Sequence, residues 1–160
     1  MKRAGFTMIE LIFVIVILGI LAAVAIPKLA ATRTDAGVSK MASNIATVVS
    51  DLGAYYTSQG TYSGNWTDFT NVRLDTSATG GTAATTYAAG TAVYLNDGLT
   101  AAKSCFSISA TTDGNVTVTG LTAGTDPVCA GAHAAAIKNN IITAVGTGKV
   151  HEFGGAGVQY

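Results

Sequence analysis

The stretch that decides the fold is Phe6-Thr-Met-Ile-Glu10-Leu-Ile-Phe-Val-Ile-Val-Ile-Leu-Gly19-Ile-Leu-Ala-Ala-Val-Ala-Ile26, an apolar run with one carboxylate. At about 1.5 Å per residue, a helix of this length spans roughly 30 Å, the thickness of a bilayer core. The run is therefore predicted to be a membrane-spanning helix. Glu10 is the exception, because a charged side chain in a membrane helix costs about 2.5–3.5 kcal/mol on insertion scales and needs a partner.

A short basic leader precedes the run. Residues 1–5 contain Lys2 and Arg3, and the positive-inside tendency places this end in the cytoplasm and the rest of the chain outside. The alternative is an ordinary signal peptide, because residues 23–25 (Ala-Val-Ala) have the form of a cleavage site, and the product would then be a soluble secreted protein. Against it, the apolar run is longer than the roughly 7–15 residues of such peptides, and a carboxylate has no purpose in a discarded segment.

Beyond the run, apolar side chains recur at intervals of three and four, which indicates an amphipathic helix. The members of this stripe are Val38, Met41, Ile45, Val48 or Val49, Leu52, and Tyr55 or Tyr56. The helix is predicted to end near Gly60, where the periodic pattern stops. Pro27 has no amide hydrogen and clashes with the carbonyl of Ala23, so a kink or a locally melted turn is expected between Gly19 and Pro27.

Residues 61–160 are rich in Thr, Ser, Ala and Gly and contain short strand-like segments. Strands are expected at residues 92–95, 105–110 and 116–119, with a hairpin turn at residues 113–115 (Asp-Gly-Asn) between the last two. Residues 150–155 are a candidate edge strand. The predicted fold class is α+β, with a long N-terminal helix, membrane-spanning in its lower half and amphipathic in its upper half, packed on a small antiparallel β-sheet.

The connections of this domain are expected to differ in character. Trp66 and Phe69, in the segment from residue 62 to 72, are expected to pack on the sheet. Residues 76–86 are of low complexity and are predicted to form a mobile surface loop. Residues 132–145 are expected to form a short helix or an irregular packed segment.

The two cysteines indicate a disulfide, and the balance of charges bears on the kind of partner that is expected. Cys105 and Cys129 lie in the part of the chain expected outside the cytoplasm, where an oxidising compartment favours a disulfide. Nine basic and nine acidic residues balance, and the basic ones are scattered, so no nucleic-acid partner is expected.

The N-terminal motif resembles that of type IV pilins and type II secretion pseudopilins. The resemblance rests on a basic leader ending in Gly5, the sequence Phe6-Thr-Met-Ile-Glu10-Leu, an apolar stretch with Gly19, and Pro27 just beyond it, and it covers roughly residues 1–55. It implies cleavage between Gly5 and Phe6 by a membrane-embedded prepilin peptidase, which also N-methylates Phe6. The division that follows is a leader at 1–5, a transmembrane or filament-core helix at 6–27, an amphipathic helix at 28–60 and a pilin-like head domain at 61–160.

The resemblance also suggests a partner for Glu10. Cleavage would create a positive amine on Phe6, and family resemblance implies that Glu10 pairs with this amine on a neighbouring subunit and so sets the axial register. Pairing within one helix is an alternative, as is a carboxylate that reaches the lipid headgroups. The resemblance to filament pilins further implies that the helix melts between Gly19 and Pro27 in the assembled state. In typical pilins the disulfide fastens the extreme C-terminus, whereas here the chain continues well past Cys129.

The predicted function is that of a structural subunit of a type IV pilus or a type II secretion pseudopilus. Before assembly it would be a single-pass inner-membrane protein with a cytoplasmic N-terminus, in contact with membrane lipid. An inner-membrane assembly platform would then build it into a homo-oligomeric helical filament, periplasmic or extracellular. A minor pilin that binds DNA or another ligand at a filament tip is an alternative, and so is the secreted protein of the signal-peptide hypothesis.

Chemistry within the head domain is not expected. Asp97, Asp113 and Asp126 lie in glycine-containing loops and are weak calcium candidates, but they lack the spacing of an EF-hand. His133 and His151 have no partnered ligands nearby and are expected to be surface or structural residues. No nucleophile–base pair or phosphate loop is present, so neither an enzyme nor a cofactor is predicted.

Overall fold

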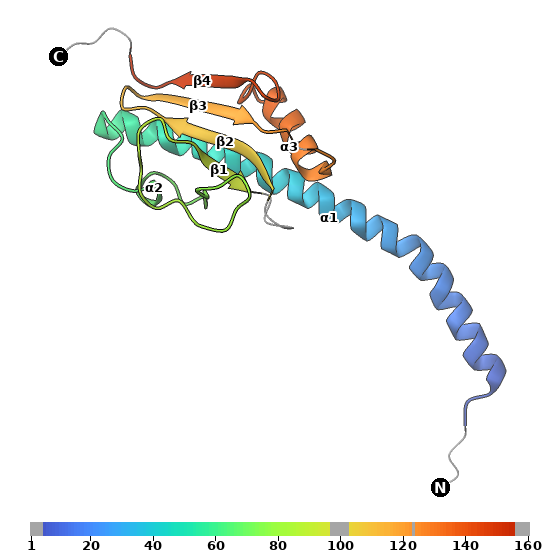
Figure 1. Ribbon diagram of the computed structural model, residues 1–160. Helices are drawn as coiled ribbons and strands as arrows, with labels where there is room; N and C mark the ends of the chain where they lie inside the picture. Colours follow the sequence, from blue (N-terminus) through green and yellow to red (C-terminus); the bar gives the residue numbers. More distant parts are fainter. Residues whose placement is uncertain (1–4, 97–102, 123, 156–160) are drawn as a thin grey trace. The chain divides into compact units, whose positions relative to one another are not determined.

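The computed structural model describes residues 5–96, 103–122 and 124–155. The chain divides into two compact units, Met1–Asp35 and Ala36–Tyr160, which are described separately. Helix α1, Met8–Gln59, contributes its first part to one unit and its second part to the other (Figure 1). The α+β layout, with a long N-terminal helix and a four-stranded antiparallel sheet, confirms the predicted fold class.

The C-terminal end of α1 is set by a glycine. Gly60 has a φ of 74°, and its amide donates to the carbonyl oxygen of Tyr56 at 2.7 Å. This left-handed conformation carries no Cβ penalty in glycine and ends a helix while satisfying one of its last carbonyl groups. The predicted end of the helix is therefore confirmed.

Pro27 lies inside α1, and the helix is continuous on both sides of it. A kink or a locally melted turn was expected between Gly19 and Pro27, and no melted turn interrupts the helix there in this structure. Proline removes a single backbone hydrogen bond, and the bonds of the neighbouring turns hold the helix across that gap. Melting in an assembled state stays a prediction.

The sheet is built from four consecutive antiparallel strands in the order β1-β2-β3-β4 (Figure 1). The strands are β1 Val93–Asn96, β2 Ser104–Ala110, β3 Asn115–Gly120 and β4 Gly148–Glu152. The first three lie within one residue of the predicted ends, and β4 is the expected edge strand, displaced toward the N-terminus. Gly114, with a φ of 82°, makes the predicted turn between β2 and β3.

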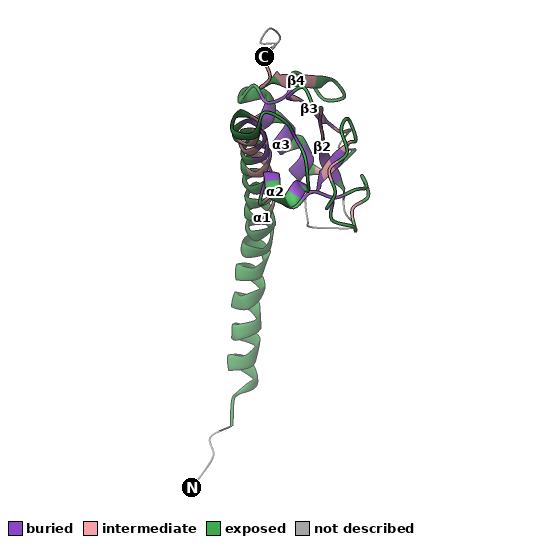
Figure 2. Ribbon diagram, turned by 90° about the vertical axis from the view of Figure 1, so that its left-hand side faces the viewer, coloured by how far each residue is buried: buried purple, intermediate pink, exposed green. Residues whose placement is uncertain are grey.

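The core of the second unit lies between the sheet and the second part of α1. Its largest fully buried side chains include Ile45, Val48 and Leu52 from α1 and Phe106, Ile108, Val116 and Val118 from the sheet. Figure 2 shows these buried positions as purple segments of the sheet and helices. Each such side chain contributes about 1.5–3 kcal/mol through removal from water, so this contact decides where the sheet docks.

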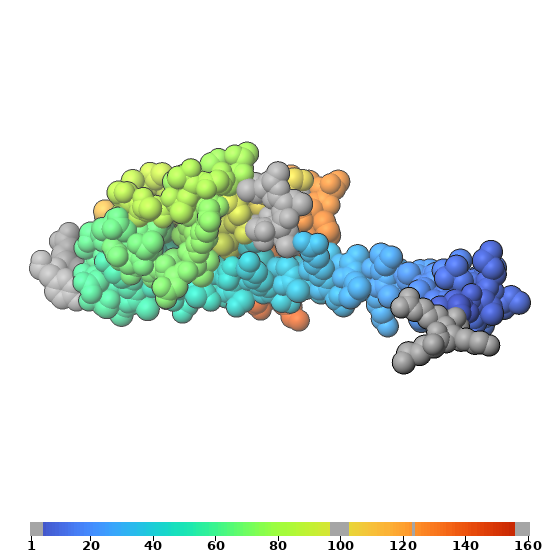
Figure 3. All heavy atoms as spheres, turned by 90° about the horizontal axis from the view of Figure 1, so that it is seen from below, coloured from blue at the N-terminus to red at the C-terminus, as the bar shows by residue number. Residues whose placement is uncertain are grey.

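The segment between α1 and β1 packs as an aromatic cluster. It contains the short helix α2, Trp66–Phe69, whose two aromatic rings are buried, as predicted. Tyr62 is also buried, and its hydroxyl donates to the carbonyl oxygen of Leu52 at 2.9 Å. Figure 3 shows this segment, in green and yellow-green, lying along the second part of α1.

Residues 76–86 form no helix or strand and are mostly exposed, in agreement with the predicted surface loop, and backbone hydrogen bonds anchor both ends of the segment; its mobility stays a prediction. The amide of Thr76 donates to the carbonyl oxygen of Thr82 at 2.9 Å, and the amide of Ala84 donates to Leu74 at 2.7 Å. Ala84 is buried in the core, and Thr86 forms a β-bridge with Asn65. These bonds depend on neighbouring segments, which a low-complexity composition does not reveal.

Helix α3, Pro127–Lys138, begins earlier than the segment predicted at 132–145. Asp126 caps it: its Oδ1 accepts hydrogen bonds from the amides of Val128 at 2.8 Å and Cys129 at 3.5 Å. An Asp followed by Pro is a start signal for a helix, because the carboxylate satisfies free amides and proline needs no acceptor there. A disulfide joins Cys129, in the first turn of α3, to Cys105 in β2, in agreement with the expected oxidised state.

Candidate functional site

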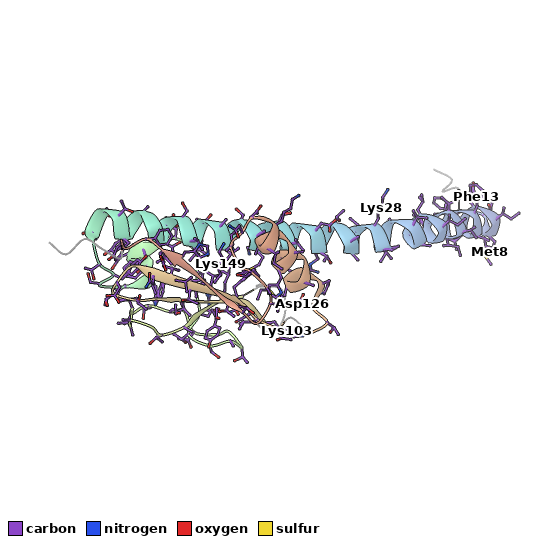
Figure 4. The ribbon with its side chains drawn as sticks, turned by 90° about the horizontal axis from the view of Figure 1, so that it is seen from above. Met8, Phe13, Lys28, Lys103, Asp126 and Lys149 are labelled. Atoms are coloured by element: carbon purple, nitrogen blue, oxygen red, sulfur yellow. A yellow bond between two sulfur atoms is a disulfide. The ribbon has the colours of Figure 1, made fainter. Side chains whose placement is uncertain are left out.

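The N-terminal segment presents an exposed apolar surface in the part of the chain that the structure describes. Phe6 is 89% exposed, and large apolar side chains remain exposed along α1 as far as Leu29. Figure 4 shows Met8 and Phe13 projecting from the start of α1, with Lys28 further along the helix. By length and composition, α1 is able to cross a membrane. Gly5 and Phe6, the predicted cleavage pair, lie just before the helix and are exposed.

Glu10 is bonded to Thr7 in a reciprocal cap. Both the backbone amide and the hydroxyl of Thr7 donate to Oε2 of Glu10 at 2.8 Å. In return, the amide of Glu10 donates to Oγ1 of Thr7 at 3.3 Å. The amide of Leu11 donates to the carbonyl oxygen of Thr7 at 3.3 Å, the first bond of the helix. This arrangement is a capping box, which satisfies amides that would otherwise lack acceptors in the first turn.

Thr7 is the residue that sequence reasoning missed. The spacing Thr-x-x-Glu ahead of an apolar run is a recognised signature of a helix start and was visible at residues 7–10. The cap uses only one carboxylate oxygen of Glu10. Within the described part of the chain, Oε1 accepts no hydrogen bond and no cation pairs with the carboxylate. Thr7 therefore orients Glu10 without neutralising it.

The three calcium candidates do not form a site among the described residues. Asp97 lies outside the described residues. Asp113 is exposed in the turn that precedes β3, whereas Asp126 lies beyond the other end of β3 and caps α3. In the described ranges, no group of three or more His, Cys, Asp or Glu side chains is placed to hold a metal ion.

Both histidines make structural hydrogen bonds. Nε2 of His133, which is buried in α3, donates to the carbonyl oxygen of Cys105 at 2.7 Å, and its ring meets Phe106 edge-on. Nε2 of His151 donates to the carbonyl oxygen of Ile141 at 2.8 Å. Each ring ties β2 or β4 to the region of α3, so a structural role accounts for both.

The N-terminal segment also matches a known family motif. The profile of the prokaryotic N-terminal methylation motif matches residues 1–26. The chain carries the signal motif of type IV pilins and pseudopilins. The motif contains the exposed Gly5–Phe6 pair, the Thr7–Glu10 cap and most of the apolar surface described above. No curated protein and no solved structure matches the chain.

Proposed function

We propose that the chain is a filament subunit of the type IV pilin class, either of a surface pilus or of a secretion pseudopilus. The observation that carries this proposal is the exposed apolar surface of residues 6–29, which contains a single carboxylate. Leaving a large apolar side chain in water costs about 1.5–3 kcal/mol of free energy relative to burying it. This surface therefore requires lipid before assembly and the helices of other subunits afterwards.

Processing supplies the missing charge. Prepilin peptidase cleaves between Gly5 and Phe6 and methylates the new amine of Phe6, as the methylation motif supports. In the filament core, an unpaired carboxylate or ammonium costs several kcal/mol. The free Oε1 of Glu10 accepts a hydrogen bond from the Phe6 ammonium of a neighbouring subunit, while Oε2 keeps the hydrogen bonds that Thr7 donates to it. A subunit displaced along the filament loses this pair, so the pair sets the axial register.

The assembly route follows from the topology. The precursor is held in the inner membrane with its basic N-terminus in the cytoplasm, and an assembly platform in that membrane extracts it into the growing filament. The sheet of the second unit, with its disulfide, lies outside the cytoplasm. The chain contributes no catalytic group to its own processing.

Two measurements test the proposal. The intact mass of the mature chain should correspond to a start at methylated Phe6, and a start at Ile26 would instead identify a secreted protein. Glu10→Ala should be cleaved normally but should give few or irregular filaments. The matched control is Glu152→Ala, which removes an exposed carboxylate from β4 and should leave filament yield unchanged. Normal filaments from Glu10→Ala would refute the charge pair.

Whether the filament is a pilus or a pseudopilus is decided by where it is found. Long filaments on the cell surface that contain this chain, seen by immunogold electron microscopy, would establish the pilus. Confinement to the periplasm at native expression would establish the pseudopilus.

A further inference from the structure

The second unit contains an open cavity lined by both polar and apolar residues, none of which belongs to the apolar surface of residues 6–29. Its volume is about 510 Å³, within the range of small-ligand sites, which is about 300–1,000 Å³. The polar side chains that line it come from α1, from the segment that follows α2, and from the end of β1. They are Lys40, Asn44, Asn71, Arg73, Asp75 and Asn96.

Arg73 is held in place at this cavity. Its Nε donates to Oδ1 of Asp75 at 3.2 Å, and its Nη2 donates to the carbonyl oxygen of Gly81 at 3.3 Å. The side chain of Asp75 is only 8% exposed and also accepts a hydrogen bond from Asn96, so the anchor is itself fixed. A guanidinium has five N–H donors, and these two bonds leave the others available to a ligand. An oriented guanidinium loses little freedom when it binds a planar anion.

The charges of the cavity favour an anionic ligand. Asp75 balances the charge of Arg73, and Lys40 adds a further positive charge. Lys40 and Asn44 are four residues apart on α1 and so lie on the same face of the helix. Among the described residues, neither side chain has a hydrogen-bond partner, and the same holds for Asn71. The cavity therefore has a net positive charge from Lys40, N–H donors of Arg73 that remain available to a carboxylate, and amide groups that can both donate to and accept from hydroxyls.

We infer that this cavity binds an acidic saccharide, a sugar unit that carries a carboxylate, such as a hexuronate within a longer glycan. The carboxylate lies between Arg73 and Lys40, and the ring hydroxyls meet the amides of Asn44 and Asn71. A single acidic side chain from another protein would leave most of the volume empty and both amides unused. A nucleic-acid strand needs a longer track of positive charge than two cations provide. The second unit is then a ligand-binding head, whatever α1 assembles into.

The test is an isothermal titration calorimetry experiment in which an oligogalacturonate is titrated into the full-length chain in detergent micelles. Saturable binding with a Kd below about 1 mM is expected, and a neutral oligosaccharide of the same length should bind at least about tenfold more weakly. Lys40→Gln should weaken oligogalacturonate binding roughly tenfold, the usual effect of losing one charge-assisted hydrogen bond. The matched control is Lys138→Gln, which removes an exposed lysine from the last turn of α3 and should bind as the unchanged chain does.

Each result decides for or against the saccharide. Absence of saturable binding, equal affinity for the neutral oligosaccharide, or equal losses in Lys40→Gln and Lys138→Gln would overturn the inference. Tighter binding of single-stranded DNA or polyphosphate would overturn it in favour of a phosphate ligand. Lys40 is exposed on α1, so its substitution should leave the far-ultraviolet circular dichroism unchanged. Asn44→Ala, with the charge intact, should lower affinity for oligogalacturonate but not for free acetate.

Discussion

Gly131 of α3 lies directly against Val38 of α1: a Cβ on Gly131 would come within 2.6 Å of Cγ2 of Val38. Both residues belong to the second unit, and the contact fixes how closely α3 approaches α1. Valine has a stiff side chain, so it cannot rotate away cheaply. Only a residue without a side chain fits at this point of α3.

Gly131→Ala should therefore destabilise the second unit. Alanine improves helix propensity by up to about 1 kcal/mol, whereas overpacking of this kind costs about 1–3 kcal/mol, so a net loss of about 1 kcal/mol is expected. Urea unfolding of the full-length chain, followed by near-ultraviolet circular dichroism, measures it. In a Val38→Ala background the same substitution should become neutral or favourable. A Gly131→Ala chain as stable as the original would contradict the steric account.

Thr7→Val should loosen the start of α1 because it removes the hydroxyl that bonds both ways with Glu10. Loss of a helix cap costs about 1 kcal/mol, which corresponds to roughly fivefold faster amide hydrogen exchange. The effect is expected at the amide of Glu10 in the precursor, in detergent micelles. Thr7→Ser keeps the hydroxyl and should exchange as the original does. Unchanged exchange in Thr7→Val would show that the cap contributes nothing.

Removal of the Cys105–Cys129 disulfide should destabilise the second unit. The bond closes a loop with a sequence separation of 24, for which the chain-entropy model gives about 3–4 kcal/mol. The double variant Cys105→Ala, Cys129→Ala should therefore unfold at lower urea concentration, with an equal or steeper dependence of the free energy of unfolding on urea, because the unfolded chain is no longer cross-linked. The control is thiol labelling of the original chain, unfolded but not reduced, which should find no reactive cysteine. Two labelled sites would show that the bond does not form.

The free energy of unfolding should fall at alkaline pH because the phenol of Tyr62 ionises less readily in the folded chain than in the unfolded chain. Burial raises the pKa of this phenol above its ordinary value, and the nearby Tyr87 and Tyr56 add to the shift. Since the folded pKa lies above the unfolded value of about 10, the contribution to the free energy of unfolding is complete below pH 10 and is lost as the pH rises above it. Urea unfolding at a series of pH values from about 9 to 11 should show this decline.

Tyr62→Phe separates ionisation from packing. This variant loses the hydrogen bond to Leu52, at a cost of about 0.5–1.5 kcal/mol, but should show a shallower decline above pH 10. An equally steep decline in the variant would assign the alkaline effect to other groups. Tyr87, whose pKa is raised mainly by burial and then by Asp113, is the next residue to substitute.

Short-range patterns allowed the elements to be predicted. The period of the α1 stripe placed Ile45, Val48 and Leu52 on the buried face, and each is fully buried. The turn at Gly114 and the end of α1 at Gly60 were predicted because positive φ angles favour glycine. Two kinds of feature were missed. The caps at Thr7 and Asp126 were readable from local sequence and were overlooked, whereas the bonds that hold residues 76–86 were not visible in it.

By itself, the sequence determined the apolar helix, its single carboxylate, the strands and the oxidised cysteine pair, because each depends on neighbours within a few residues or on the compartment. Tertiary structure alone decided that Gly131 meets Val38 and that His133 bonds to Cys105. It also brought Lys40 of α1 to the same cavity as Arg73. These contacts join residues far apart in the chain, and they exist only once burial of apolar faces has chosen which surfaces pack together.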